Sequence, residues 1–207
     1  MIDLELTGLD PAIDEIISYA ILPVVGGRLR LSGMRHQLIR PRRMPDATTI
    51  PIHGLMRRDL VDAPTLPEAL DGLLDALTGQ VLVAHVASVE RRFLKAAFGP
   101  EGPPLANPII DTAQLAAVVL RRRRIAVPRS IDLSRLAGIL GLPVHRPHTA
   151  DGDALTTGQV FLALVSDLDA SSPQTVGSLL HHGSRSRLPA APLALRRALA
   201  RLTPRRP

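Results

Sequence analysis

Residues 2–10 read IDLELTGLD, and this stretch decides the fold. Its first five residues are apolar at every other position, which predicts a β-strand. Asp3 and Glu5 lie two apart on that strand, so both side chains point to the same face. Two carboxylates this close repel each other unless a cation lies between them, and ligation by oxygen alone suits Mg²⁺ or Mn²⁺. Thr7 and Gly8 follow at the strand end, where a glycine lets a ligand approach the backbone closely.

A second acidic cluster lies in residues 148–154, HTADGDA, at the start of the last predicted core helix. Asp153 falls in the first turn of that helix and His148 on the incoming loop, so an imidazole and a carboxylate share one helix entrance. Asp151 lies two residues before Asp153 and therefore points about 200° away from it on the helix. Only one of the two can face a site with Asp3, and we expect Asp151 to cap the helix instead.

A third segment, residues 82–94 (LVAHVASVERRFL), reads as a short buried strand that leads into a helix. This strand-to-helix arrangement directs Glu90 from the helix toward the same site. The alternative for Glu90 is a solvated charge beside Arg91 and Arg92, and this segment on its own would favour that interpretation.

The composition limits both the chemistry and the location of the chain. It contains no cysteine, which excludes disulfides, thiolate zinc sites and cysteine nucleophiles, so any metal must be held by oxygen or imidazole. No apolar run reaches the roughly 18 residues that a membrane span needs. The N-terminus carries carboxylates where a signal peptide would carry lysines and an apolar block. We therefore expect a cytoplasmic protein with no membrane partner.

The net charge of +6 favours a polyanionic partner such as nucleic acid. A GC-rich genome, which inflates arginine everywhere, explains the same charge equally well. Aromatic residues make up only 2% of the chain, so extensive stacking of bases on aromatic side chains is not expected.

Strand-like and helix-like segments alternate along the chain. Strands are predicted at residues 2–6, 15–25, 29–39, 81–84 and 108–110. Helices are predicted at residues 65–77, 88–98, 111–120, 131–140 and 150–165, and residues 40–51 read as a loop. This order predicts an α/β fold, and the early hairpin makes its central sheet mixed. Residues 1–165 are assigned to one domain and residues 166–207 to a basic, partly disordered C-terminal extension.

Taken together, these segments resemble the DEDDh (DnaQ-like) 3′–5′ exonucleases, the family that includes the proofreading epsilon subunit of bacterial DNA polymerase III. The first family motif is close to D-x-E-T-T-G-L and reads D-L-E-L-T-G-L at residues 3–9. The third, H-x-A-x-x-D-A, is matched in full by residues 148–154. Two lesser landmarks also appear in order, IHGL at residues 52–55 and IIDTAQLA at residues 109–116. The resemblance covers residues 1–165 and implies a ribonuclease H-like fold, a central mixed β-sheet flanked by helices.

The second motif departs from the family pattern H-N-A-x-F-D-x-x-F-L and reads H-V-A-S-V-E-R-R-F-L at residues 85–94. Val86 replaces an amide, Val89 an aromatic residue and Glu90 an aspartate. The extra methylene moves the carboxylate about 1.5 Å, comparable to shifts that can cost ~100-fold in rate, so the resemblance implies activity but not the full family rate.

Only Met1 and Ile2 precede the first motif, so its strand is expected to be poorly anchored, and an upstream start of the native chain stays open.

By resemblance, Asp3, Glu5 and Asp153 hold two divalent ions, Mg²⁺ or Mn²⁺, with Glu90 contributing to one of them directly or through water. In such a site one ion lowers the pKa of a bound water and both hold the scissile phosphate as negative charge builds. His148 would be the general base that takes the proton of the water, a role suited to a side chain type that titrates near neutral pH.

The resemblance also implies contacts with the substrate. Thr7, Gly8 and Leu9 would cradle the 3′-terminal nucleotide through backbone contacts and an apolar wedge, and His53 would contact the same nucleotide. His85 is a further candidate for substrate binding, although shaping the strand-to-helix turn is the simpler role for it.

The main hypothesis is a metal-dependent 3′–5′ exonuclease that releases nucleoside 5′-monophosphates from single-stranded DNA ends in proofreading or repair. A DNA polymerase subunit is a candidate partner. RNA 3′-end trimming is an alternative, because the residues do not reveal which group would read the 2′-hydroxyl. A catalytically weakened fold that acts as a nucleic-acid-binding or polymerase-binding module is another. Glu90 and the short first strand favour that module, whereas the otherwise intact acidic set and His148 oppose it.

Overall fold

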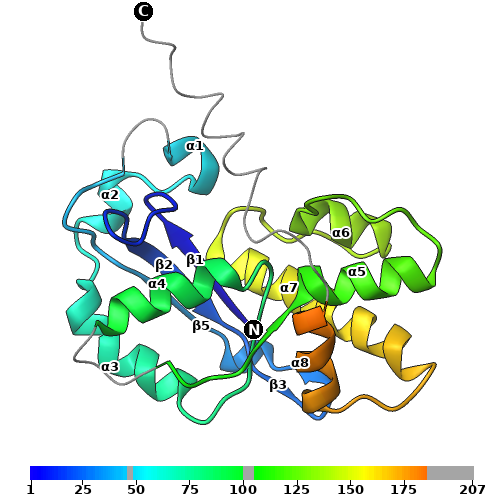
Figure 1. Cartoon of the computed structure of the whole chain (residues 1–207). Helices are drawn as coiled ribbons and strands as arrows, with labels where there is room; N and C mark the ends of the chain where they lie inside the picture. Colours follow the sequence, from blue (N-terminus) through cyan, green and yellow to red (C-terminus); the bar gives the residue numbers. More distant parts are fainter. Residues whose placement is uncertain (46–48, 100–104, 186–207) are drawn as a thin grey trace, which may run out of the picture.

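Three antiparallel strands form the central sheet of the computed structural model, which describes residues 1–45, 49–99 and 105–185 (Figure 1). Their order in the sheet is β1 (Ile2–Leu6), β2 (Ile16–Ile21) and β5 (Arg35–Leu38). In the register of β1 with β2, Asp3 lies opposite Ala20 and Glu5 opposite Ser18. The Leu22 N–H donates to the Met1 carbonyl over 2.9 Å, so the outer end of β1 is hydrogen-bonded rather than poorly anchored.

The strands expected at residues 15–25 and 29–39 are both interrupted. Pro23 has no N–H for the ladder, and β2 ends at Ile21 before it. The chain then forms a small hairpin of β3 (Val24–Val25) and β4 (Arg28–Leu29), whose turn residues Gly26 and Gly27 have φ angles of 58° and 71°. A 3₁₀ turn, η1 (Leu31–Gly33), separates this hairpin from β5.

A parallel pair of strands, β6 (Leu82–Ala84) and β7 (Ile109–Asp111), completes the β-structure. β6 contacts β1, so antiparallel and parallel strands lie side by side. All residues of β6 are buried, which is typical of a strand that is covered on both faces.

Helices cover both faces of β1. Its apolar side chains pack with α3 (Leu66–Leu77) and α4 (Ser88–Phe98) in one core cluster that includes Leu73 and Phe93. The other face, which carries Asp3 and Glu5, is covered by α7 (Ala150–Asp169), whose small residue Ala154 packs against β2. The predicted α/β fold with a central sheet flanked by helices is therefore confirmed. The hydrogen-bonded ladders of the described residues, however, form separate antiparallel and parallel sheets rather than one mixed sheet.

Short helices surround the end of β1. α1 (Ile50–His53) begins within the segment expected to be a loop, and α2 (Arg57–Leu60) follows it. α6 (Leu133–Ile139) comes after α5 (Thr112–Arg122) along the chain. Figure 1 shows α1 above the end of β1 and α6 to the right of it.

The C-terminal part of the described chain differs from the boundary expected at residue 165. α7 continues to Asp169, and α8 (Val176–Arg185) packs against α5 and β7. Leu179 of α8 is buried in the same core cluster as Leu164 and Leu168 of α7. The expected extension therefore needs correction over residues 166–185, because the Ser- and Pro-containing stretch is only the link between two core helices. Residues 186–207 lie outside the described residues.

α7 is the longest of the described helices, with 20 residues. Within the part of the chain that the structure describes, no helix is both long and apolar enough to span a membrane.

Candidate active site

Three carboxylates from distant parts of the chain meet where α7 begins. β1 contributes Asp3 and Glu5, and the first turn of α7 contributes Asp153. One carboxylate oxygen of each lies within 4.8 Å of the other two. The strand period of two places Asp3 and Glu5 on the face that α7 covers, so the geometry follows directly from the β1–α7 packing.

Burial and mutual repulsion raise the pKa of each of these carboxyl groups. Burial, followed by the charge of Asp153, raises the pKa of Glu5 to about 8. Burial, followed by the charges of its acidic neighbours, raises the pKa of Asp3 well above its usual value. The pKa of Asp153 is also raised, mainly by burial. Such a cluster carries its full negative charge only at an energetic cost, which a bound divalent cation would remove.

Glu90 lies in the first turn of α4 and is only 5% exposed. Its Oε2 has no hydrogen-bond partner among the described residues. Burial, with a smaller contribution from the charge of Asp111, raises the pKa of Glu90 to about 8. The interpretation of Glu90 as a solvated charge is therefore wrong. Its carboxyl lies close enough to the acidic cluster to raise the pKa of Asp3.

His148 lies on the loop before α7, with its side chain exposed at the edge of the same site. Its backbone N–H donates to Asp153 Oδ2 over 3.1 Å. Its φ angle of 61° falls in the left-handed region, which residues other than glycine rarely adopt. The hydrogen bond fixes this unusual conformation and keeps the imidazole beside the carboxylate cluster.

The cap of α7 is Thr149 rather than Asp151. The Thr149 side chain accepts a hydrogen bond from the Gly152 N–H over 3.3 Å. Asp151 instead forms an ion pair with Arg146. The prediction that Asp151 caps the helix is wrong, because a threonine in extended conformation already occupies the cap position. Only Asp153 of the two aspartates joins the cluster, as the helical geometry predicts.

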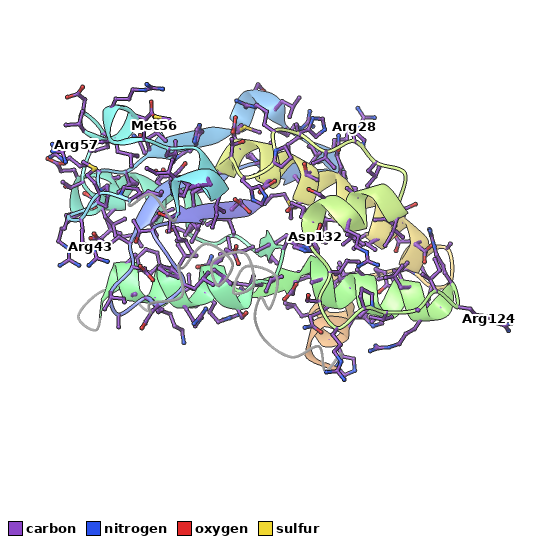
Figure 2. All side chains as sticks on the ribbon, turned by 90° about the horizontal axis from the view of Figure 1, so that it is seen from above. Arg28, Arg43, Met56, Arg57, Arg124 and Asp132 are labelled. Atoms are coloured by element: carbon purple, nitrogen blue, oxygen red, sulfur yellow. The ribbon has the colours of Figure 1, made fainter. Side chains whose placement is uncertain are left out.

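These groups line one cavity of about 220 Å³. Its remaining walls come from the end of β1, from α1, from the turn between β6 and α4, and from the loop that leads into α6. Figure 2 shows Asp132, another lining residue, at the end of α6 that faces the middle of the molecule. The apolar lining residues are Leu4, Leu6, Leu9, Ile52, Val86, Val89, Ile131 and Leu133. The cavity therefore combines an acidic group with largely apolar walls.

Of the three residues expected to cradle a nucleotide, Gly8 and Leu9 line the cavity and Thr7 does not. The Thr7 N–H donates to the Glu15 carbonyl over 3.0 Å, and Thr7 Oγ1 accepts from the Glu15 N–H over 2.9 Å. Thr7 therefore closes the loop after β1 and has no N–H left for a ligand. Gly8 has a second reason to be glycine, since a Cβ atom there would overlap the Asp14 carboxylate.

The two histidines expected near the substrate differ in what they offer. His53 lines the cavity, and its Nδ1 accepts from the Leu55 N–H over 3.0 Å, while Nε2 has no partner among the described residues. His85 also lines the cavity, but its Nδ1 lies 2.9 Å from Thr112 Oγ1 and its Nε2 lies 3.0 Å from the Ile131 carbonyl oxygen. Both ring nitrogens of His85 are used within the protein. These bonds favour the turn-shaping role, and substrate binding by His85 stays a prediction.

The loop before α6 contributes cavity residues for which the sequence gives little signal. Ser130 lines the cavity, yet no motif or periodicity marks it, and Ile131 lines the cavity from the loop although it was expected to begin a helix. Asp132 falls inside the helix predicted at residues 131–140, but it is the N-cap of α6, and an aspartate before an apolar run is a known signal for a helix start. Its Oδ1 accepts from the Arg135 N–H over 2.7 Å. Thr49, on the opposite wall, falls in the expected loop and had no signal either.

The donor set of this site fits a divalent cation that prefers oxygen. Asp3, Glu5 and Asp153 supply carboxylate oxygens at short mutual distances, and Glu90 supplies a buried oxygen that nothing else in the described chain satisfies. Mg²⁺ and Mn²⁺ take ligands of this kind, whereas the chain has no thiolate for a softer metal.

The sequence is similar to that of known proteins over the part of the chain that contains the site. A family model described as "Exonuclease" matches residues 1–161, which contain all four carboxylates and His148. A Rhodobacter capsulatus protein named DNA polymerase III subunit epsilon-like protein is 34% identical over 180 residues, covering 86% of this chain and 25% of that relative. The PolC-type DNA polymerase III of Thermotoga maritima is 34% identical over 166 residues, covering 80% of this chain and 12% of that relative. The chain thus spans a quarter or less of the length of these two relatives.

Solved structures share the fold. Exonuclease X in complex with 5′ overhanging duplex DNA has a TM-score of 0.63 at 22% identity, covering 88% of this chain and 97% of that one. The nuclease domain of 3′hExo, a DEDDh family member bound to rAMP, has a TM-score of 0.66 at 19% identity, covering 80% of this chain and 90% of that one. Identities this low establish the fold alone, whereas the family model covers most of the sequence. The chain therefore belongs to the exonuclease family whose model matches residues 1–161.

Proposed function

We propose that this protein is a metal-dependent 3′–5′ exonuclease that releases nucleoside 5′-monophosphates. The observation that carries the proposal is the convergence of Asp3, Glu5 and Asp153, whose oxygens lie within 4.8 Å of one another in the cavity. Membership of the exonuclease family supports the reaction class. The polarity, the ions and the substrate are part of the proposal.

Asp3, Glu5 and Asp153 would hold two Mg²⁺ or Mn²⁺ ions, and Glu90 would contribute its buried, unpartnered oxygen to one of them. When bound, the ions would lower the pKa of a water and compensate the negative charge that builds on the scissile phosphate. The raised pKa values of Glu5 and Glu90 mean that both groups release protons as the site fills near neutral pH.

His148 would accept the proton of the attacking water. Its imidazole is exposed at the cavity, and its backbone bond to Asp153 keeps it beside the acidic cluster. A positioned general base of this kind contributes about 10²–10⁴-fold to a rate. Asp153 would therefore both hold the ions and orient the loop of the base.

The size of the cavity favours cleavage at a chain end. Its volume of about 220 Å³ lies below the roughly 300–1,000 Å³ of pockets that hold drug-sized ligands. It therefore suits a single terminal nucleotide rather than a run of bases. Leu9 and Ile52 offer apolar contacts to a base or sugar, and His53 Nε2 offers a hydrogen bond.

Single-stranded DNA is the proposed substrate, with proofreading or repair as the context in the cytoplasm. Two relatives at 34% identity are named after DNA polymerase III, which supports DNA over RNA and makes a polymerase subunit the proposed partner. An RNA oligomer of matched sequence is the direct comparison.

The test is digestion of 5′-labelled single-stranded oligomers with Mg²⁺, Mn²⁺ or EDTA. We expect products that shorten one nucleotide at a time from the 3′ end with either metal, and intact oligomer with EDTA. Asp3→Ala should abolish digestion, and His148→Ala should lower kcat by about 10²–10⁴-fold. Asp75→Ala is the matched control, because this exposed carboxylate on α3 lies outside the cavity and should leave the rate unchanged.

Two results would refute the proposal. A wild-type protein that binds the DNA oligomer but releases nothing with either metal would instead be a nucleic-acid-binding module, the role that Glu90 in place of aspartate would explain. Immediate release of the 5′ label as a mononucleotide would refute the polarity.

A further inference from the structure

The turn between β6 and α4, residues 85–87, is hydrogen-bonded by two side chains at the start of α5. Asp111 Oδ1 accepts from the Val86 N–H over 3.1 Å, and Asp111 Oδ2 accepts from the Ala87 N–H over 3.1 Å. Thr112 Oγ1 lies 2.9 Å from Nδ1 of His85. Each of the three turn residues is thus bonded to Asp111 or Thr112, which we call the α5 clamp.

The same carboxylate also starts α5. Asp111 is the N-cap of α5, and its Oδ1 accepts from the Ala113 N–H over 2.9 Å. β6 and β7 are parallel neighbours with Ala84 opposite Asp111, so the helices that follow them begin side by side. One acid therefore fixes the beginnings of both α4 and α5 relative to each other.

These hydrogen bonds matter because the backbone of the turn is strained. Val86 has a φ angle of 61°, a left-handed conformation that is an outlier for a β-branched residue. Such conformations persist only where the surroundings over-determine them. The two N–H bonds to Asp111 supply that constraint at Val86 and at the residue after it.

Glu90 depends on where this turn places α4. It lies in the first turn of α4, three residues after Ala87, and its side chain is buried with Oε2 unpartnered in the described chain. A buried side chain on the first helical turn has little freedom of its own. Any shift of the helix start therefore moves the Glu90 carboxylate by a similar distance.

We propose that Asp111 is a positioning residue for Glu90: through the N–H groups of Val86 and Ala87 it sets the depth at which α4 carries the Glu90 carboxylate into the acidic site. The inference rests on the proposed function, because it takes Glu90 to be a ligand of the bound ions. Asp111 itself is not among the residues that line the cavity.

Two substitutions separate positioning from charge. Asp111→Asn keeps the shape and one acceptor oxygen, but its NH₂ group then faces the Ala87 N–H, a donor against a donor. Thr112→Val removes the bond to His85 without any change of charge. Asp169→Asn is the matched control, because Asp169 accepts from the Gln174 N–H over 2.6 Å at the far end of α7.

The measurement is the Mn²⁺ dissociation constant by titration calorimetry, in a double-mutant cycle with Glu90→Gln. Asp111→Asn should weaken Mn²⁺ binding about 10-fold in the wild-type background, the scale found for residues that orient metal ligands. In the Glu90→Gln background, Asp111→Asn should not weaken Mn²⁺ binding further, since the carboxylate that Asp111 positions is absent. Thr112→Val should act in the same direction, and Asp169→Asn should leave the constant unchanged.

A second readout needs no metal. The amide hydrogens of Val86 and Ala87 should exchange faster in Asp111→Asn than in the wild type.

Equal weakening of Mn²⁺ binding in both backgrounds would overturn the inference, as would an effect of Asp111→Asn with none of Thr112→Val. If the wild type binds Mn²⁺ and the Asp111→Asn variant binds it equally tightly, this inference alone is refuted. A wild type that binds no Mn²⁺ refutes the proposed function and the inference with it.

Discussion

Val86 is a position at which this chain differs from the family pattern but keeps the backbone conformation of the motif. The family pattern has asparagine here, a residue that enters the left-handed region several times more often than most, whereas valine is branched at Cβ. The turn nevertheless keeps its φ angle of 61°. The chain therefore retains the shape of the motif with a residue that fits it poorly, and Asp111 holds that shape in place.

Val86→Asn should raise the free energy of unfolding by about 1 kcal/mol, because the relief of strain exceeds the apolar contact that a half-buried valine loses. Denaturant titration measures the change. Val89→Asn is the matched control, since Val89 is also half-buried at the cavity but lies on helical backbone. It should destabilise. A loss of stability at position 86 equal to that at position 89 would show that the turn is not strained.

The sequence predicted the position of some site residues better than that of others. Asp3 and Glu5 could be placed on one face because the strand period is fixed by backbone geometry. The contacts of Thr7 with the Glu15 backbone and of His85 with the Ile131 carbonyl could not be predicted, because their partners are backbone groups. A backbone carbonyl or N–H is present at every residue, so the sequence does not mark which one a side chain will meet.

Among the helices, those with long apolar periodicity were predicted closely and the four-residue helices were not. α4 occupies residues 88–98, as expected, and α3 begins one residue after the expected start. α1 and α2 have four residues each, and helices so short owe their formation to tertiary contacts rather than to their own sequence. The strands around η1 were predicted as continuous because Pro23 and the hairpin that follows it were not recognised as interruptions.

α8 provides the test of the domain boundary. Leu179 is 6% exposed and packs with α5 and α7, so Leu179→Ala should lower the free energy of unfolding by about 2–5 kcal/mol. Thermal unfolding measures this. Val176→Ala on the same helix is the control, because Val176 is 48% exposed and its truncation should cost about 0.5 kcal/mol or less. Equal and small effects of both substitutions would mean that residues 176–185 are an appendage after all.

At the scale of the whole molecule, the two ends of the family-matched region come together only in the folded chain. β1 supplies Asp3 and Glu5, α7 supplies Asp153, and α4 supplies Glu90. In the unfolded chain these carboxyl groups are far apart and titrate at their ordinary values. Folding without a cation therefore concentrates negative charge, and the protonation of the cluster is linked to stability.

The pH dependence follows from the raised pKa values of Glu5 and Glu90, both shifted from 4.5 to about 8. Between these values the folded protein binds more protons than the unfolded chain, so stability is greatest at the acidic end and falls as pH rises toward 8. Bound Mn²⁺ favours the ionised carboxylates and removes this loss, so the stabilisation by Mn²⁺ should grow over the same range.

Thermal unfolding from pH 5 to pH 8, with and without Mn²⁺, tests most directly whether these carboxylates form a metal site. At pH 8, Mn²⁺ at about 100 times its dissociation constant should add about 2.7 kcal/mol, which raises Tm by about 5–10 °C. Glu5→Gln combined with Glu90→Gln should reduce the loss of stability with pH, because only the raised pKa values of Asp3 and Asp153 remain, and should remove most of the response to Mn²⁺. A wild-type Tm that rises toward pH 8 without metal, or that does not respond to Mn²⁺ there, would contradict the assignment of the site.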